Sequence, residues 1–133
     1  LGESDMPLQR GHVYLAPGGD RHMLVSGSAP NRLRIVLRPG DQITGHRPSV
    51  DALFLSVAEK LGAAAVGALL TGMGEDGARG LLAMARAGAH TIAQDEATSV
   101  VFGMPRAAIN MGAARVIAPL DSIAGHMLGL EVA

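Results

Sequence analysis

The stretch AAAVGALLTGMGEDGARGLLAMARAGAHTIAQ, residues 63–94, decides the fold. Residues 63–70 are wholly apolar, which is typical of a strand that is buried on both faces. The pattern then predicts a helix over about 77–87, ended by Gly88, and a second strand at 90–94. A strand, a helix and a strand joined by short loops predict a parallel β-α-β unit.

A helix is predicted immediately before this unit. Ser49 is suited to cap its N-terminus, and Gly62 is suited to end it. Apolar residues repeat between these two positions at the spacing of one helix face: Val50, Leu53, Phe54, Val57, Ala58 and Leu61. The face that they form predicts a helix packed against the sheet.

The alternation also continues after the unit. A helix is predicted from near Pro105 to Gly112, because proline suits the first helical position. A strand follows at 115–118, and Asp121 is expected to cap a last helix. From residue 49 onward the order is therefore α-β-α-β-α-β-α, which indicates a parallel sheet with helices on its faces.

The first third of the chain predicts an antiparallel addition. VYLA (13–16) and HMLV (22–25) are expected to form a hairpin across the turn PGGD (17–20). After a loop, GSAPN (27–31), the alternation in RLRIVLR (32–38) predicts a strand with one solvated face. The fold class is therefore α/β: a doubly wound, largely parallel sheet with helices on both faces and an antiparallel hairpin.

Length and composition exclude several classes of protein. The 133 residues fit one domain, and 11 basic against 12 acidic side chains give no basic excess for a nucleic-acid surface. The absence of cysteine excludes disulfides and thiolate metal sites, and it fits a cytosolic protein. The longest apolar run, 63–70, is too short for a membrane span, and no signal peptide is expected before the domain. Because Leu1 leads almost at once into a strand-like segment, we expect a piece of a longer protein.

The loop after the first parallel strand has two interpretations. Gly72, Gly74 and Gly77 spell G-x-G-x-x-G, and an acid follows eighteen residues later at Asp95, as in a dinucleotide site. However, Asp76 would place a carboxylate at the helix N-terminus, where it would repel a phosphate. Asp76 could also be a helix cap and nothing more. Ligands and catalytic groups gather beyond the carboxyl ends of parallel strands. This loop is therefore the candidate site whether it binds a phosphate or presents an acid.

Five ordered blocks carry a resemblance to a known family. They are GHVYLAPGGDRHM (11–23), HRPSVDALF (46–54), LLTGMGEDGARGL (69–81), AGAHTIAQDEATSVVFGMPRAAINMGA (87–113) and VIAPLDSIAGHML (116–128). In these blocks the chain resembles the C-terminal esterase domain of the CheB-type chemotaxis protein-glutamate methylesterases. The resemblance covers about residues 10–130, so that 1–133 is expected to be the C-terminal portion of such a domain.

The resemblance implies a function and a set of site residues. Members of the family hydrolyse glutamyl methyl esters on the cytoplasmic helices of chemoreceptors, and some deamidate receptor glutamines. They use a Ser-His-Asp triad without a cofactor or metal, and a receiver domain usually precedes the esterase. The resemblance implies that Asp76 is the acid of the triad. It also implies that Met73, between Gly72 and Gly74, offers a backbone N–H to the oxyanion. A cytoplasmic location, without membrane insertion or nucleic-acid binding, is implied as well.

The chain departs from the family pattern in one respect. The nucleophile block G-x-S-T-G-G and the base block Q-H-M-P are absent, and both are expected upstream of Leu1. We therefore expect the chain to be inactive alone. Among the histidines, His46 is the best candidate for an active-site neighbour, whereas the others are expected to be surface or structural residues: His12, His22, His90 and His126.

Two further groups keep two interpretations each. Gln94, Asp95 and Glu96 either shape a substrate groove or form a solvated acidic loop. Arg106 either meets an acidic receptor helix or is an ordinary surface charge. A non-catalytic docking domain on the same fold is the remaining alternative to an enzyme.

Overall fold

The computed structural model describes residues 1–28 and 32–129. The elements in chain order are β1 (Met6–Pro7), β2 (Arg21–Ser28), β3 (Arg32–Pro39), α1 (Val50–Leu61), the 3-10 turn η1 (Gly62–Ala64), β4 (Val66–Leu69), α2 (Ala78–Arg86), β5 (His90–Gln94), α3 (Met104–Asn110), β6 (Val116–Ala118) and α4 (Leu120–Met127). The alternation predicted from residue 49 onward is confirmed.

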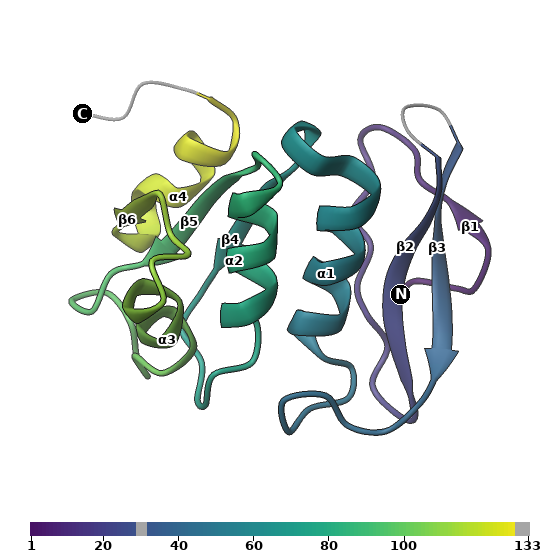
Figure 1. The fold of residues 1–133 in the computed structure, drawn as a ribbon, viewed down its shortest axis with the longest axis horizontal. Helices are drawn as coiled ribbons and strands as arrows, with labels where there is room; N and C mark the ends of the chain where they lie inside the picture. The colour runs from purple at the N-terminus through teal and green to yellow at the C-terminus, as the bar shows by residue number, and fades with distance from the viewer. Residues whose placement is uncertain (29–31, 130–133) are drawn as a thin grey trace.

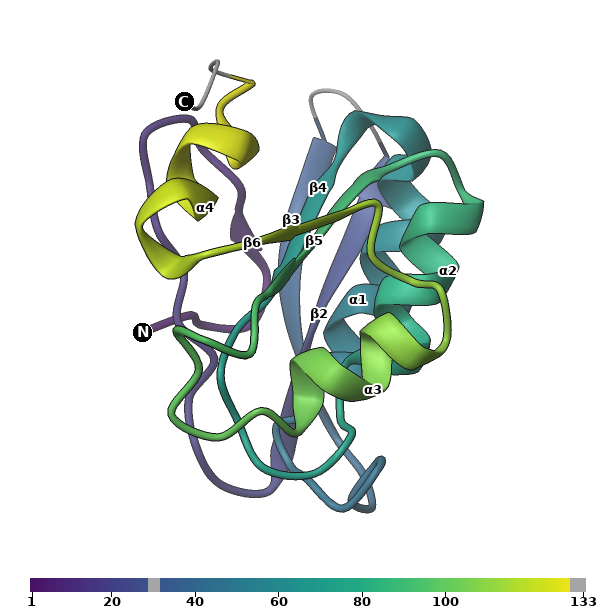
Figure 2. The same cartoon turned by 90° about the vertical axis from the view of Figure 1, so that its left-hand side faces the viewer.

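The second half of the chain forms a parallel sheet. Its strand order is β4-β5-β6, with Val66 opposite His90 and Ile92 opposite Val116. Helices α2 and α3 cover one face of this sheet and α4 covers the other (Figures 1 and 2). Helix α1 packs beside α2 and contacts β2, so it joins the two halves of the molecule (Figure 1). The predicted α/β class, with helices on both faces, is confirmed.

The first half of the chain forms a separate antiparallel sheet with strand order β1-β3-β2. The predicted hairpin is wrong in its first strand, because residues 13–16 are irregular and β2 pairs instead with β3. Val13 and Leu15 are 89% and 62% exposed, so the alternating apolar side chains of this segment do not pack against the rest of the molecule. Residues 27 and 28 lie in β2 and not in a loop, and residues 29–31 lie outside the described residues.

The predicted solvated face of β3 is confirmed. Ile35 is buried in the middle of the strand. Arg32, Arg34 and Arg38 are exposed. The alternation in sequence therefore corresponds to the two faces of the strand.

Two element boundaries differ from the prediction. The apolar run 63–70 contributes only four residues to β4, because residues 62–64 continue α1 as a 3-10 turn. Burial along β4 alternates, with Gly67 and Leu69 buried but Val66 38% exposed, since β5 is its partner among the described strands. Asp121 is not a cap: Pro119 precedes α4, and Asp121 lies exposed in the first turn.

A core of small and aliphatic side chains brings α1 and α2 together. Leu69 of β4 and Leu81 of α2 are buried in one cluster, and Phe54 of α1 packs against it. Gly80 of α2 allows the close approach, since a Cβ at this position would lie 2.6 Å from the Cβ of Phe54. The N-terminal ends of the two helices consequently lie next to each other, beside the loop that follows β4 (Figure 1).

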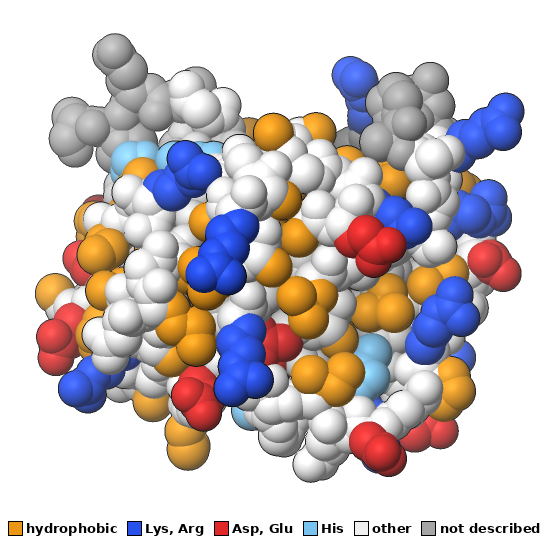
Figure 3. All heavy atoms as spheres, viewed as in Figure 1, with side chains coloured by type: hydrophobic (Ala, Val, Ile, Leu, Met, Phe, Trp, Pro, Cys, Tyr) orange, Lys and Arg blue, Asp and Glu red, His pale blue; other side chains and the backbone are white. Residues whose placement is uncertain are grey.

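The surface gives two further findings. On the face drawn in Figure 3, acidic, basic and apolar side chains are interspersed over the helices. Of the helices in the described ranges, none combines the length and the apolar character that a membrane crossing requires.

Candidate active site

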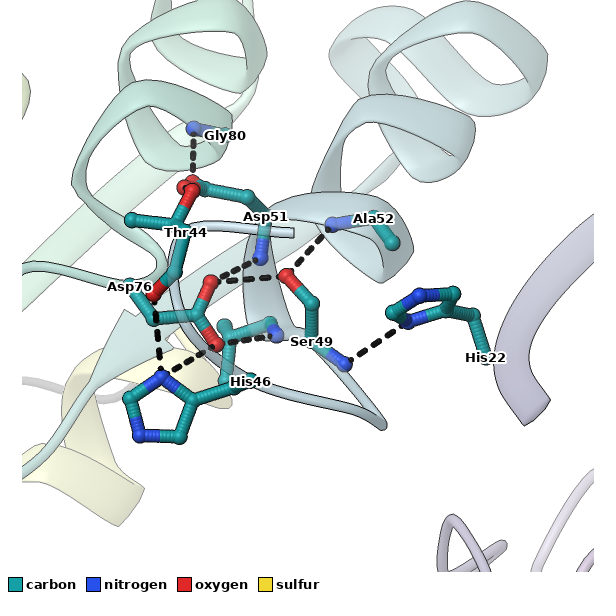
Figure 4. A network of polar contacts seen from close by, with 9 residues as sticks. His22, Thr44, His46, Ser49, Asp51, Ala52, Asp76 and Gly80 are labelled. Atoms are coloured by element: carbon teal, nitrogen blue, oxygen red, sulfur yellow. Dashed lines mark hydrogen bonds and ion pairs between the residues drawn. The ribbon is translucent and has the colours of Figure 1, made fainter. Parts of the chain in front are cut away.

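Asp76 is the most enclosed charged group beyond the end of β4. Its side chain reaches across to the N-terminus of α1, and the residue is only 1% exposed (Figure 4). Its Oδ1 accepts hydrogen bonds from the Ser49 hydroxyl at 2.7 Å and from the Asp51 N–H at 2.9 Å. Its Oδ2 accepts a hydrogen bond from the Val50 N–H at 2.7 Å.

These contacts explain how a carboxylate can be buried without a cation. The first N–H groups of a helix have no partner within the helix, and the helix dipole favours a negative charge beside them. Asp76 lies in the loop before α2, but it finds these N–H groups at the start of α1 and not at the start of α2. A carboxylate has about four acceptor positions, and the three donors leave one position on Oδ2.

His46 lies near the Oδ2 atom that carries the remaining position. Its Nδ1 lies 3.8 Å from Asp76 Oδ2, beyond hydrogen-bond distance, and 3.1 Å from the carbonyl oxygen of Thr44. The His46 side chain is half exposed. The structure therefore brings His46 and Asp76 together without a hydrogen bond between them.

Asp51 makes the complementary contact to α2. This residue is 2% exposed, and its Oδ1 accepts a hydrogen bond from the Gly80 N–H in the first turn of α2 at 2.7 Å. Its Oδ2 accepts a hydrogen bond from the Thr44 hydroxyl at 2.6 Å. The two helices thus cap each other. Asp76, in the loop before α2, accepts from the first turn of α1, and Asp51 of α1 accepts from the first turn of α2 (Figure 4).

His22 belongs to the same network, although its sequence context gave no reason to place it there. The ring is 4% exposed. Its Nδ1 lies 3.0 Å from the Ser49 nitrogen, and its Nε2 lies 2.7 Å from the Asp41 carbonyl oxygen. Because a backbone N–H can only donate, we assign Nδ1 as acceptor and place the proton on Nε2. The neutral ring fixes the backbone of Ser49 from the side opposite to Asp76.

The loop that carries Met73 is held by backbone and amide contacts. The Gly72 N–H donates to the Val101 carbonyl, and the Gly72 carbonyl accepts from the N–H groups of Gly103 and Met104. A Cβ at Gly103 would lie 2.6 Å from the Gly72 oxygen, so this contact requires glycine. Met73 itself is 76% exposed at the tip of the loop.

Gln94 ties the same loop to the neighbouring strand. The side chain is fully buried, and its Oε1 accepts from the Thr71 N–H at 2.7 Å. Its Nε2 donates to the Thr98 carbonyl at 2.8 Å. Glu96 is exposed. The three residues 94–96 therefore do not act alike, and Gln94 is a buried support of the loop.

The contacts at α2 disfavour the dinucleotide hypothesis. A pyrophosphate would need the N–H groups at the start of α2, where the Asp51 carboxylate already accepts from Gly80. Asp95, the candidate ribose ligand, accepts hydrogen bonds from the N–H and hydroxyl groups of Thr98 in its own loop. An acid does occupy the helix N-terminus, as predicted, but it is Asp51 and not Asp76.

An open hollow of about 480 Å³ lies beside the loop. It is lined by Gly74, Glu75, Gly103, Arg106, Ala107, Asn110 and Met111. Asp76 and His46 are not among the residues that line it. Arg106 is exposed, and it faces the same hollow as Glu75.

Comparisons with known proteins agree on one family. A family model described as CheB methylesterase matches residues 2–127. A protein-glutamate methylesterase/protein-glutamine glutaminase of Bordetella avium is 56% identical over 127 residues, covering 96% of this chain. A protein of the same description from Xanthomonas oryzae pv. oryzae is 53% identical over 130 residues. The chain spans about a third of the length of these curated relatives, 35% in each case.

A solved structure gives the same result for the fold. The catalytic domain of the Thermotoga maritima CheB methylesterase superposes with a TM-score of 0.90 at 33% sequence identity. The match covers 96% of this chain and 67% of that domain.

Proposed function

This chain belongs to the CheB methylesterase family, and we propose that the protein containing it hydrolyses the methyl esters of glutamate side chains on bacterial chemoreceptors. The names of the relatives support the glutamate methyl ester as the group that is hydrolysed, and they support deamidation of protein glutamine as a second activity. Under this proposal residues 1–133 are the C-terminal portion of the methylesterase domain. The rest of the domain lies in the part of the relatives' length that this chain does not span.

The proposed chemistry is acyl transfer through a Ser-His-Asp triad. A serine outside this chain attacks the ester carbonyl while a histidine, also outside it, takes the serine proton. The tetrahedral intermediate collapses, the histidine returns the proton to the leaving oxygen, and methanol departs. Water then hydrolyses the acyl-enzyme by the same sequence and leaves a free glutamate carboxylate. With a glutamine substrate the leaving group is ammonia.

We assign the orienting acid of this triad to Asp76. The supporting observation is the geometry of the carboxylate, which is buried beyond the end of β4 with one acceptor position remaining on Oδ2. An imidazole that donated its Nδ1–H to this position would be held in the tautomer and orientation that a general base requires. His46, 3.8 Å away, is proposed to border this imidazole and not to replace it.

We also assign the oxyanion donor to the loop 72–74. The backbone of Gly72 is fixed by its bonds to Val101, Gly103 and Met104, so the N–H of Met73 has a defined position. A preorganised N–H of this kind stabilises the negative charge of a tetrahedral intermediate. The proposed partners are methylated receptor helices and a receiver domain in the full-length protein, and the proposed location is the cytoplasm.

The test is the Asp76→Asn variant of the full-length protein, assayed by methanol release from methyl-labelled chemoreceptors. An asparagine amide has only one acceptor oxygen, so it cannot accept hydrogen bonds on both sides as the carboxylate does, and it carries no negative charge to stabilise the imidazolium. We therefore expect kcat to fall about 10⁴-fold. Asp121→Asn, an exposed acid in the first turn of α4, serves as the control and should retain activity. A fall of less than tenfold for Asp76→Asn would remove this residue from the triad.

One further outcome is informative. If the wild-type full-length protein binds methylated receptor but releases no methanol, the fold serves as a docking module and the enzymatic proposal is wrong.

A further inference from the structure

The Ser49 hydroxyl makes two hydrogen bonds, one as an acceptor and one as a donor. Its hydroxyl oxygen accepts a long bond from the Ala52 N–H at 3.3 Å, as an N-cap of α1 would. The same hydroxyl donates to Asp76 Oδ1 at 2.7 Å, a short bond to a charged acceptor. Ser49 is 3% exposed, so water does not compete for this bond.

The bond from Ser49 restricts the carboxylate in a way that backbone donors alone do not. Val50 and Asp51 donate from one short segment of α1, one to each oxygen of Asp76. The Ser49 hydroxyl adds a second donor to Oδ1, so this oxygen has no acceptor position left. The position that remains is on Oδ2, where a histidine would have to bind.

The position of Ser49 is itself fixed from behind. His22 accepts the Ser49 N–H at 3.0 Å and is held in turn by the Asp41 carbonyl oxygen at 2.7 Å. The network runs from Asp41 through His22 and Ser49 to Asp76. Figure 4 shows the part from His22 to Asp76, which connects the antiparallel sheet with the loop after β4.

We propose that Ser49 is a positioning residue for the esterase reaction, because its hydroxyl aims the Asp76 carboxylate so that Oδ2 alone receives the catalytic imidazole. This inference rests on the proposed function of Asp76. It predicts that loss of the hydroxyl affects kcat through Asp76 and leaves receptor binding unchanged.

The experiment compares Ser49→Ala and Ser49→Gly in the full-length protein, with methanol release from methyl-labelled chemoreceptors as the assay. Glycine is nearly as good an N-cap as serine, so it preserves α1 while removing the donor. Both variants should lower kcat by about tenfold to a hundredfold at unchanged KM, the range that one lost charge-assisted hydrogen bond converts to. Ser49→Thr keeps a hydroxyl and should recover most of the activity.

Thr44→Val is the matched control. It also deletes one hydroxyl that donates to a buried aspartate, but that aspartate is Asp51, and the bond length is 2.6 Å. If the effect of Ser49 were only structural, both variants would lower kcat alike. We expect Thr44→Val to stay within about threefold of wild type, since Asp51 holds α2 and not the imidazole.

A double variant separates this inference from the proposed function. In an Asp76→Asn background, Ser49→Gly should cost less than about twofold further, because residues that act as a unit are not additive. A full additional loss, or a Ser49→Gly protein within twofold of wild type, would overturn the positioning role. If Asp76→Asn itself retains wild-type kcat, the assignment of the triad acid fails first, whatever Ser49 does.

Discussion

At the scale of single residues, the contacts of Asp76 leave room for the proposed second task beside its capping of α1. Its carboxylate caps the first turn of α1, and one acceptor position on Oδ2 remains for another donor. Capping and orienting a histidine are therefore not competing interpretations of this side chain. The helix N-terminus supplies the donors that a buried carboxylate needs, and an orienting acid needs the same support.

A second prediction for a single residue concerns the sign of the stability change in Gly80→Ala. Helix propensity alone expects Gly80→Ala to stabilise α2 by about 1 kcal/mol. The structure predicts the opposite, because the new Cβ would lie 2.6 Å from the Phe54 Cβ and 3.2 Å from the Asp51 Cα. We expect Gly80→Ala to reduce the free energy of unfolding by about 1–3 kcal/mol, as overpacking does.

Urea denaturation of the two proteins measures this difference. Arg79→Ala, at the exposed neighbouring position, is the control and should change stability by less than about 0.5 kcal/mol. A gain of stability in Gly80→Ala would show that α1 and α2 are not in the contact described.

At the scale of elements, the two aspartates link α1 and α2 through their N-termini. Asp51 accepts from Gly80 in α2, and Asp76, in the loop before α2, accepts from Val50 and Asp51 in α1. Neither helix can shift along its axis without breaking a bond to a buried charge. The position of the candidate site is therefore set by a pair of helices and not by the loop alone.

This link predicts that Asp51→Ala and Asp121→Ala, at equivalent positions of two helices, reduce stability by different amounts. Asp51 and Asp121 are both the second residue of their helices, but Asp51 is buried and Asp121 is exposed. Asp51→Ala leaves the buried Gly80 N–H without its acceptor and should destabilise the protein by about 1–3 kcal/mol. Asp121→Ala loses only an interaction with the helix dipole, worth about 0.3–1 kcal/mol.

Denaturant midpoints of the two variants give the comparison directly. Equal losses in Asp51→Ala and Asp121→Ala would mean that Asp51 acts through the dipole of its own helix and does not cap α2.

The elements also show what sequence can and cannot predict. The alternation after residue 49 was predictable, since buried apolar runs and glycine stops act locally. The strand expected at 13–16 was wrong because alternation alone does not provide a face to bury against. The contact of Asp76 with α1 and the place of His22 could not be read from the sequence, because both depend on residues 26 and 27 positions apart.

At the scale of the whole molecule, the parallel sheet has an edge at β4. Among the described strands β4 pairs only with β5, and Val66 and Leu70 are 38% and 43% exposed. A strand edge with exposed apolar side chains favours pairing between chains. We expect the isolated 133-residue chain to self-associate in sedimentation velocity experiments at micromolar concentration.

Val66→Lys provides the control for that expectation, since a charge on an edge strand opposes pairing. It should shift the isolated chain toward monomer. A wild-type chain that sediments as a monomer at these concentrations would contradict the role assigned to the β4 edge.

A last prediction for the whole molecule concerns the esterase activity of the isolated chain. The isolated chain supplies an orienting acid and an oxyanion loop under the proposal, but it lacks the nucleophile and base blocks of the family. We expect it to release no measurable methanol from methyl-labelled chemoreceptors, whereas the full-length protein does. Turnover by the isolated chain would move the catalytic groups to residues within it, with His46 as the first to test.

The most direct test of the role proposed for Asp76 is a crystal structure of the full-length protein. We expect a histidine from outside residues 1–133 to place a ring nitrogen about 2.6–3.2 Å from Asp76 Oδ2. We also expect the bonds from Ser49, Val50 and Asp51 to this carboxylate to be unchanged. A structure in which no such imidazole reaches Oδ2, so that Asp76 only caps α1, would contradict the claim.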